Sequence, residues 1–217
     1  PRPGSLADVS RVFSDARGRE HEIPEPPRRV VSLVPSLTET LFALGLGGCV
    51  VGVTEYCVHP ADRVRDLPQV GGTKNPSLER ILELEPDLVL ANREENRRRD
   101  VERLEAGGVP VFVTYARSVR EGSDEIGLLG RIGDRVDAAR EIQAGIEAAG
   151  ERARSRAREP APGVAALIWK KPYMAVGGDT FADDLITQCG GRNVFRDAGR
   201  RYPRVEDADL VAARPGV

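Results

Sequence analysis

Between residues 29 and 115, short apolar runs alternate with segments of helical periodicity, and this alternation constrains the fold more than any other feature of the chain. Four apolar runs predict strands at 30–34, 50–54, 87–91 and 109–115, and three segments between them predict helices at 37–44, 77–84 and 96–106. Strands that alternate with helices in this way form a parallel sheet. The sequence therefore predicts an α/β lobe over residues 28–117.

The first predicted strand runs directly into a helix at Pro35. In an open α/β sheet, ligands bind at the carboxyl ends of the strands, where the N–H groups of a first helical turn are ready donors. Ser36 and Glu39 have the spacing of a capping box, which would satisfy two of these donors within the protein. Ser36 is therefore a candidate both for ligand binding and for a structural cap.

Three further segments complete the predicted organisation. Residues 1–27 form a lead-in with a hairpin around Gly18, which supplies the positive φ of such turns. Residues 118–159 contain no strand-like run, and their apolar residues recur every three or four positions, which is typical of helix. Residues 160–217 begin a second α/β lobe that ends where another strand is expected, so we expect this lobe to be truncated.

Two interpretations of the segment 118–159 stay open. One is a single connecting helix, which would be longer than most globular helices and could bridge two lobes. The other is a pair of consecutive helices broken near Gly130 or Gly133, because glycine weakens a helix interior.

Composition excludes several partners. The formal net charge of -2 and the sequence pI near 5.9 give no global attraction to nucleic acid or to an anionic membrane. No apolar run is long enough for a membrane-spanning helix, and the first residues lack a signal-peptide pattern. A lipid anchor upstream of Pro1 stays open.

Metal-ion binding by side chains alone is a weak alternative. The chain has three cysteines without zinc-type pair spacing, so neither a zinc site nor a disulfide framework is expected. Cys57 and His59 could hold a soft metal, but two ligands are too few for a closed site, and His21 is the only other histidine. We therefore predict no bound metal ion and no cofactor.

An enzyme on the same α/β scaffold is a second alternative. The sequence contains no nucleophile elbow, phosphate loop or dinucleotide fingerprint. An acidic cluster at Asp179, Asp183 and Asp184 has the spacing of a helix's first turn, where the helix dipole favours acids. We therefore predict that the chain is not an enzyme.

Five sequence blocks carry a resemblance to a known family: RRVVSLVPSLTETLFALG, VGVTEYC, NPSLERILELEPDLVLA, CGGRNVF and YPRVEDADLVAARPG. In this order and spacing they resemble the substrate-binding proteins of ABC importers that carry cobalamin and iron–siderophore chelates. The strings WKKPYMAVGGDT, GGTKNP and ANREENR are similar to the branch called helical backbone metal receptors. The resemblance implies two Rossmann-like lobes with parallel sheets joined by a long backbone helix, and a ligand held in the cleft between the lobes.

The resemblance also implies ligand-binding residues. Four aromatic residues match cleft positions of the family, namely Tyr56, Trp169, Tyr173 and Tyr202. Rigid rings cover a flat macrocycle at little entropy cost, and their polar atoms can meet peripheral amides or carboxylates. These residues are therefore expected to contact the chelate.

One departure from the family concerns charge. Where cobalamin-binding members place a tryptophan, the chain has Gly71-Gly72-Thr73-Lys74. Lys74, together with Arg93, Lys170 and Lys171, could instead make the ligand site positive. That composition favours an anionic chelate.

The resemblance finally implies a docking surface for an ABC transporter permease. Glu79 matches an exposed family glutamate that pairs with arginine on the permease, and such a charge-assisted pair gives orientation as well as affinity. The counterpart in the second lobe aligns with Ala208, and the adjacent Glu206 is the candidate substitute.

We therefore expect the substrate-binding component of an ABC importer, in a periplasmic or extracytoplasmic location, that captures cobalamin or an iron–siderophore chelate. A metal-ion or tetrapyrrole receptor not tied to uptake is the alternative, and the enzyme described above is weaker.

Overall fold

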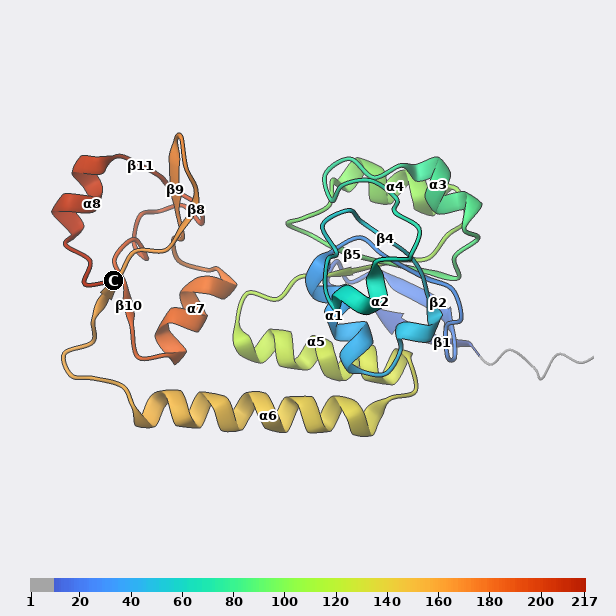
Figure 1. The fold of residues 1–217 in the computed structure, drawn as a ribbon, viewed down its shortest axis with the longest axis horizontal. Helices are drawn as coiled ribbons and strands as arrows, with labels where there is room; N and C mark the ends of the chain where they lie inside the picture. The colour runs from blue at the N-terminus through green and yellow to red at the C-terminus, as the bar shows by residue number, and fades with distance from the viewer. Residues whose placement is uncertain (1–9) are drawn as a thin grey trace, which may run out of the picture. The chain divides into compact units, whose positions relative to one another are not determined.

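The computed structural model describes residues 10–217 and divides into two compact units (Figure 1). Of the described residues, the first unit comprises 10–115 and 125–141, and the second comprises 116–124 and 142–217. Residues 1–9 of the predicted lead-in lie outside the described residues.

The first unit is built on a four-stranded parallel sheet, which confirms the α/β lobe. Its strands are β3 (Val30–Ser32), β4 (Val50–Val53), β5 (Leu88–Asn92) and β6 (Val111–Thr114), in the order β4-β3-β5-β6. Val30 pairs with Leu88, and Val89 pairs with Val111. Both central strands and β6 are almost wholly buried, as the near-continuous apolar runs indicate.

Helices cover the two faces of this sheet. The helices are α1 (Pro35–Ala43), α2 (Ala61–Val64), α3 (Leu78–Glu83) and α4 (Arg98–Ala106), with a 3₁₀ turn η1 (Gly47–Cys49). Helices α3 and α4 lie on one side and α1 on the other (Figure 1). The largest fully buried side chains include Phe112, Ile23, Leu33, Leu44, Ile81, Leu88, Leu90 and Leu104.

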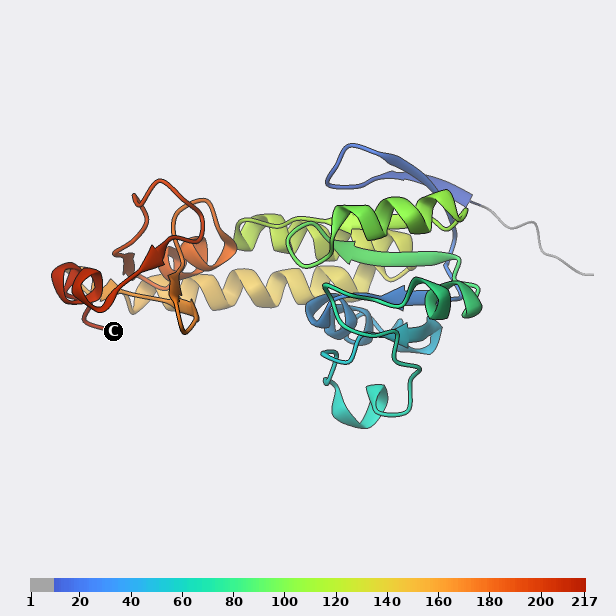
Figure 2. The ribbon, with the colours of Figure 1, turned by 90° about the horizontal axis from the view of Figure 1, so that it is seen from above.

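A hairpin precedes the sheet, as predicted. Strands β1 (Ser10–Ser14) and β2 (Glu20–Pro24) pair antiparallel (Figure 2), and Gly18 in their turn has a φ of 73°. The hairpin turn joins the edge of the sheet, because the Ala16 N–H donates to the Val113 carbonyl at 2.9 Å. The hairpin is therefore part of the first unit rather than a separate lead-in.

The segment 118–159 contains two helices, α5 (Val119–Ile132) and α6 (Val136–Ser155), which confirms the break near Gly133, and a single helix over the whole segment is wrong. The long connecting helix of the predicted fold is α6, whose residues belong to both units. Asp134 adopts a φ of 53°, and this left-handed conformation just after α5 turns the chain so that α5 does not continue into α6. Gly130 lets the two helices meet closely, because a Cβ there would lie 2.5 Å from the Cβ of Ala139. Close packing of the two helices therefore explains the glycine at 130, and at Gly133 a Cβ would lie 2.3 Å from Leu46 Cδ1.

The second unit contains two small sheets. Strands β7 (Gly163–Val164) and β10 (Arg192–Asn193) are parallel. Strands β8 (Leu167–Trp169), β9 (Tyr173–Ala175) and β11 (Arg204–Val205) form an antiparallel sheet in the order β11-β9-β8. The expected parallel sheet is thus limited here to one pair, because the short link between β8 and β9 permits only an antiparallel return.

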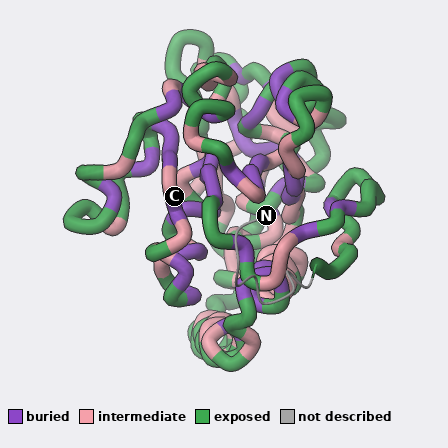
Figure 3. Tube along the Cα trace, turned by 90° about the vertical axis from the view of Figure 1, so that its right-hand side faces the viewer, coloured by how far each residue is buried: buried purple, intermediate pink, exposed green. Residues whose placement is uncertain are grey.

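Burial differs between the two units, and Figure 3 colours the described residues by how far each is buried. Among the described residues of the second unit, the buried apolar side chains are Ala175, Val176 and Val205. Large apolar residues exposed in this unit are Leu167, Ile168, Trp169, Phe181, Leu185, Val211 and Val217. The second unit therefore has a much smaller core than the first.

The helix α7 (Phe181–Gln188) begins at a buried side-chain cap. The Oγ1 atom of Thr180 accepts the N–H of Asp183 at 3.1 Å and donates to the carbonyl of Gly177 at 3.0 Å. Replacing Thr180 with the isosteric valine removes both bonds, so we expect the free energy of unfolding to fall by about 1–2 kcal/mol. Chemical denaturation measures the loss.

Thr180→Ser is the matched control for this cap, since it keeps the oxygen and removes only a methyl group. We expect it to be less destabilised than Thr180→Val. Equal or greater destabilisation of the serine variant would show that packing of the methyl group, not the cap, dominates.

Candidate functional site

Ser36 lies at the carboxyl edge of the first unit's sheet, in the first turn of α1. The helix begins at Pro35, with Val34 as its N-cap and no side-chain cap, so the predicted capping box of Ser36 and Glu39 is wrong. Proline fits the first helical position because it has no N–H to satisfy there, and this places Ser36 inside the helix. Ser36 is exposed, and its turn remains open to a ligand acceptor.

A buried polar network stands behind this turn. The Thr38 hydroxyl lies 2.8 Å from Ser32 Oγ and 3.2 Å from Cys57 Sγ, and Thr54 Oγ1 lies 3.1 Å from the same sulfur. These four side chains are buried. The Cys57 thiol therefore serves internal packing, and no group of three or more His, Cys, Asp or Glu residues within 10–217 is placed to hold a metal ion.

Tyr56 follows this network and is 57% exposed. Its ring lies over Gly72, where a Cβ would come 3.3 Å from the ring and 2.6 Å from Asn75 Oδ1. The glycine at 72 is thus required by close packing with Tyr56 and Asn75. This gives a physical reason for the absence of a bulky residue at this position.

Lys74 links two loops at the carboxyl edge of the first unit's sheet. Its Nζ donates to the carbonyl of Glu94. Asn96 Nδ2 donates to the carbonyl of Thr73 at 2.9 Å, and Asn96 Oδ1 accepts the N–H of Asn92 at 2.8 Å. These bonds hold the loop after β5 against the loop that carries Lys74.

Arg93 adds a second cation in this loop. Its guanidinium lies 4.9 Å from the centroid of the Tyr115 ring. The roles of Asn96 and Tyr115 were not predicted, because Asn96 was assigned to the start of a helix and Tyr115 to the end of a strand. The one signal that points to Asn96 is its place as a polar residue at the end of the loop that follows a predicted strand.

The second unit holds the other aromatic candidates. Trp169 ends β8 and is 63% exposed, Tyr173 begins β9 and is half-buried, and the two strands pair with each other. Tyr202 is half-buried, with the Arg201 guanidinium 5.7 Å from its ring centroid. The hairpin thus brings Trp169 and Tyr173 onto one element, with Lys170 and Lys171 exposed in its turn.

The two docking candidates have different surroundings. Glu79 is exposed in the first turn of α3. Glu206 caps α8 (Asp207–Ala213) in a capping box with Asp209, and the Glu206 N–H donates to Asp209 Oδ2 at 2.8 Å. Glu206 therefore has a structural role in its own helix.

Exposed aromatic rings and cations on an α/β scaffold are compatible with ligand binding, and the class of protein is given by the family. The family model described as periplasmic binding protein matches residues 30–216, and the chain belongs to this family. No helix within 10–217 has the length and apolarity to cross a membrane.

Individual relatives agree with this assignment. The vitamin B12-binding protein of Vibrio campbellii is 29% identical over 210 residues, which cover 95% of this chain and 74% of that protein. The periplasmic vitamin B12 binding protein BtuF of Vibrio cholerae matches with a TM-score of 0.79 and 25% identity, over 88% of this chain and 75% of that one. The periplasmic heme-binding protein RhuT from Roseiflexus matches with a TM-score of 0.75 and 30% identity, over 87% of this chain and 74% of that one.

Proposed function

We propose that the chain is the substrate-binding component of an ABC importer and that its ligand is an intact metal chelate with a flat body, cobalamin or an iron chelate such as haem. The observation that carries the proposal is the family match over residues 30–216, together with relatives named for vitamin B12 and for haem. A periplasmic or extracytoplasmic location follows from the same family.

The chemistry of the candidate residues supports such a ligand. Tyr56 and Trp169 are large aromatic residues that remain exposed, and an exposed ring is free to stack on a macrocycle. Lys74 places positive charge in the unit that also carries Tyr56, and cations pair with carboxylates. A chelate with acidic groups on its periphery fits this combination better than a neutral one.

A panel of coloured ligands tests the proposal. Purified protein is incubated separately with cyanocobalamin, haemin, a ferric hydroxamate and a ferric catecholate, and each sample is then desalted. We expect one visible spectrum to stay with the protein at near unit stoichiometry. A sample that is folded by circular dichroism but retains no chromophore would contradict the proposal.

Permease docking gives a separate prediction for Glu79. Glu79→Arg reverses the charge of an exposed residue, so we expect uptake of the ligand in cells to fall about tenfold or more while ligand affinity stays unchanged. Uptake of labelled ligand and equilibrium binding measure the two effects.

Glu20→Arg is the matched control, because Glu20 is an exposed acid of the same unit that lies on β2. We expect it to leave uptake unchanged. Normal uptake by the Glu79→Arg protein, or equal loss in both variants, would remove the docking role.

A further inference from the structure

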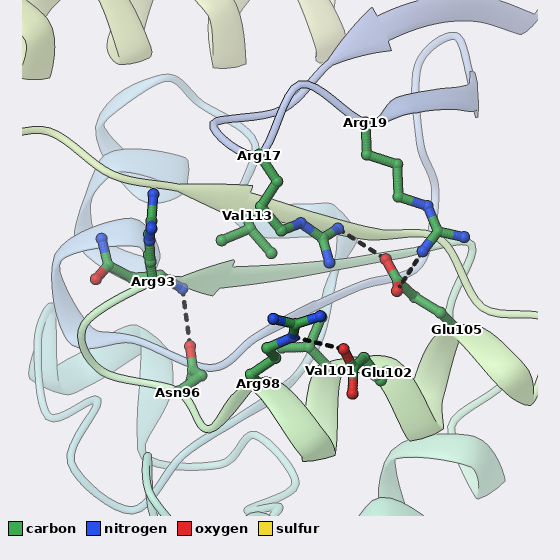
Figure 4. Close-up of a pocket in the computed structure, with 10 residues that line it drawn as sticks. Arg17, Arg19, Arg93, Asn96, Arg98, Val101, Glu102, Glu105 and Val113 are labelled. Carbon is green, nitrogen blue, oxygen red and sulfur yellow. Dashed lines mark hydrogen bonds and ion pairs between the residues drawn. The ribbon is translucent and has the colours of Figure 1, made fainter.

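The first unit contains a cavity of about 530 Å³ that the proposed chelate function does not use. Figure 4 shows side chains of the β1–β2 hairpin, the loop after β5 and helix α4 around it. Ser36, Tyr56 and Lys74 do not line it. Its size is typical of a site for a small organic molecule.

The cavity is rich in positive charge. Four arginines line it, against the two carboxylates of Glu102 and Glu105: Arg17, Arg19, Arg93 and Arg98. Glu105 is shared, since Arg17 Nη2 lies 2.7 Å from one of its oxygens and Arg19 Nη1 lies 2.6 Å from the other. The lining therefore keeps an excess of guanidinium groups over carboxylates.

Two of these arginines are available to a ligand. Arg93 makes no ion pair with a described residue, and its guanidinium is positioned by the Tyr115 ring. Arg98 pairs with Glu102 at 2.6 Å, but both side chains are largely exposed, at 91% and 52%, and such surface pairs contribute little. Arg98 can therefore exchange its partner for a ligand carboxylate at small cost.

The surroundings hold these groups in place. The Arg93 N–H donates to the Thr114 carbonyl at 3.0 Å, and Asn92 Oδ1 accepts the N–H of Glu94 at 2.9 Å, which fixes the turn. Val101 and Val113 add apolar surface that suits a carbon skeleton. A fixed turn lowers the entropy cost of binding at Arg93.

We propose that this cavity binds a small organic anion with at least two carboxylate or phosphate groups, one on Arg93 and another on Arg98. Guanidinium groups bind both kinds of oxyanion in a bidentate manner. The Arg17–Glu105–Arg19 cluster forms the opposite wall and is already neutralised in part. Of the residues that the sequence assigned to the chelate site, Arg93 lines this cavity, whereas Ser36, Tyr56 and Lys74 do not, so the cavity would hold a second ligand.

Isothermal titration with citrate and with pyrophosphate at low ionic strength tests the proposal, with acetate and glycerol as ligands that lack two anionic groups. We expect at least one of the two polyanions to bind once per chain and far more tightly than acetate. A preference for citrate identifies a polycarboxylate ligand, and a preference for pyrophosphate identifies a phosphorylated one. Absence of binding by both would overturn the proposal.

Variants locate the site. Arg93→Ala and Arg98→Ala are each expected to weaken polyanion binding by about tenfold, while Arg65→Ala is expected to change it by less than about twofold. Arg65 is the matched control because it is an exposed arginine of the same unit, paired only with the exposed Asp66. Equal weakening by Arg65→Ala would show non-specific charge attraction and would contradict a site in this cavity. These titrations use colourless ligands, so their outcome is independent of the chelate panel.

Discussion

Replacing Asp15 with alanine is expected to lower the free energy of unfolding by about 3–5 kcal/mol, because it removes one partner of a buried ion pair. The Asp15 side chain is fully enclosed and lies 2.6 Å from Arg17 Nη2 and 3.1 Å from His21 Nε2. It also accepts the backbone N–H groups of Arg17 at 2.8 Å and Arg19 at 3.1 Å. The variant leaves the backbone N–H groups of Arg17 and Arg19 without this acceptor, whereas the Arg17 guanidinium keeps its ion pair with Glu105. Chemical denaturation measures the loss.

Asp66→Ala is the control for this prediction, since Asp66 is an exposed acid whose pairing with Arg65 spans 3.6 Å. We expect it to change the free energy of unfolding by about 0.5 kcal/mol or less. A loss of similar size in both variants would contradict a structural role for the Asp15 cluster.

The same carboxylate makes stability depend on pH. Burial by itself raises the pKa of Asp15, but hydrogen bonds from Arg17, His21 and Arg19 outweigh burial, so its pKa lies below the ordinary value. A carboxylate whose pKa is lower in the folded state stabilises the protein above about pH 4, and this contribution is lost as the pH falls through the folded-state pKa. We therefore expect the stability difference between the wild type and Asp15→Ala to shrink on acidification. A difference that is constant with pH would contradict this assignment.

Replacing Trp169 with alanine is expected to weaken chelate binding by more than about tenfold. Trp169 is the single tryptophan of the chain, and this residue, at the end of β8, is 63% exposed. Its removal deletes a large rigid surface for stacking while little of the protein's own core is lost. Equilibrium titration of the chromophore measures the change.

Val211→Ala provides the matched control, because Val211 is an apolar side chain of the same unit and is 75% exposed. We expect its ligand affinity to equal that of the wild type. Unchanged affinity of Trp169→Ala would remove Trp169 from the ligand contacts, and thermal unfolding of each variant verifies that the protein is folded.

Much of the first unit could be predicted because its strands are buried on both faces. The run at 30–34 is apolar except for Ser32, the run at 88–91 is wholly apolar, and both became central strands. The capping box failed for a local reason, since Pro35 took the first helical position. The two-helix alternative was predictable from the glycines of the segment, and the break falls beside Gly133, where Asp134 takes the left-handed conformation.

The cavity of the first unit and the antiparallel sheet of the second depend on contacts that no local sequence pattern specifies. Arg17 meets Glu105 across 88 positions, so no local pattern indicates the cavity that they line. The antiparallel sheet of the second unit also departs from the parallel pattern, because Lys171 adopts a φ of 64° in the link that returns β9 beside β8. The exposure of Tyr56 and Trp169 is compatible with ligand contact, and their role stays a prediction.

The most direct test of the account is an equilibrium titration of the protein with each coloured chelate, followed by release of the ligand and its analysis by mass spectrometry. A carrier binds one chelate per chain and returns it chemically unchanged. We predict saturation at one equivalent by a single ligand class, with full recovery of the intact molecule. Failure of a folded protein to saturate with any of these chelates, or recovery of a chemically altered one, would contradict the account.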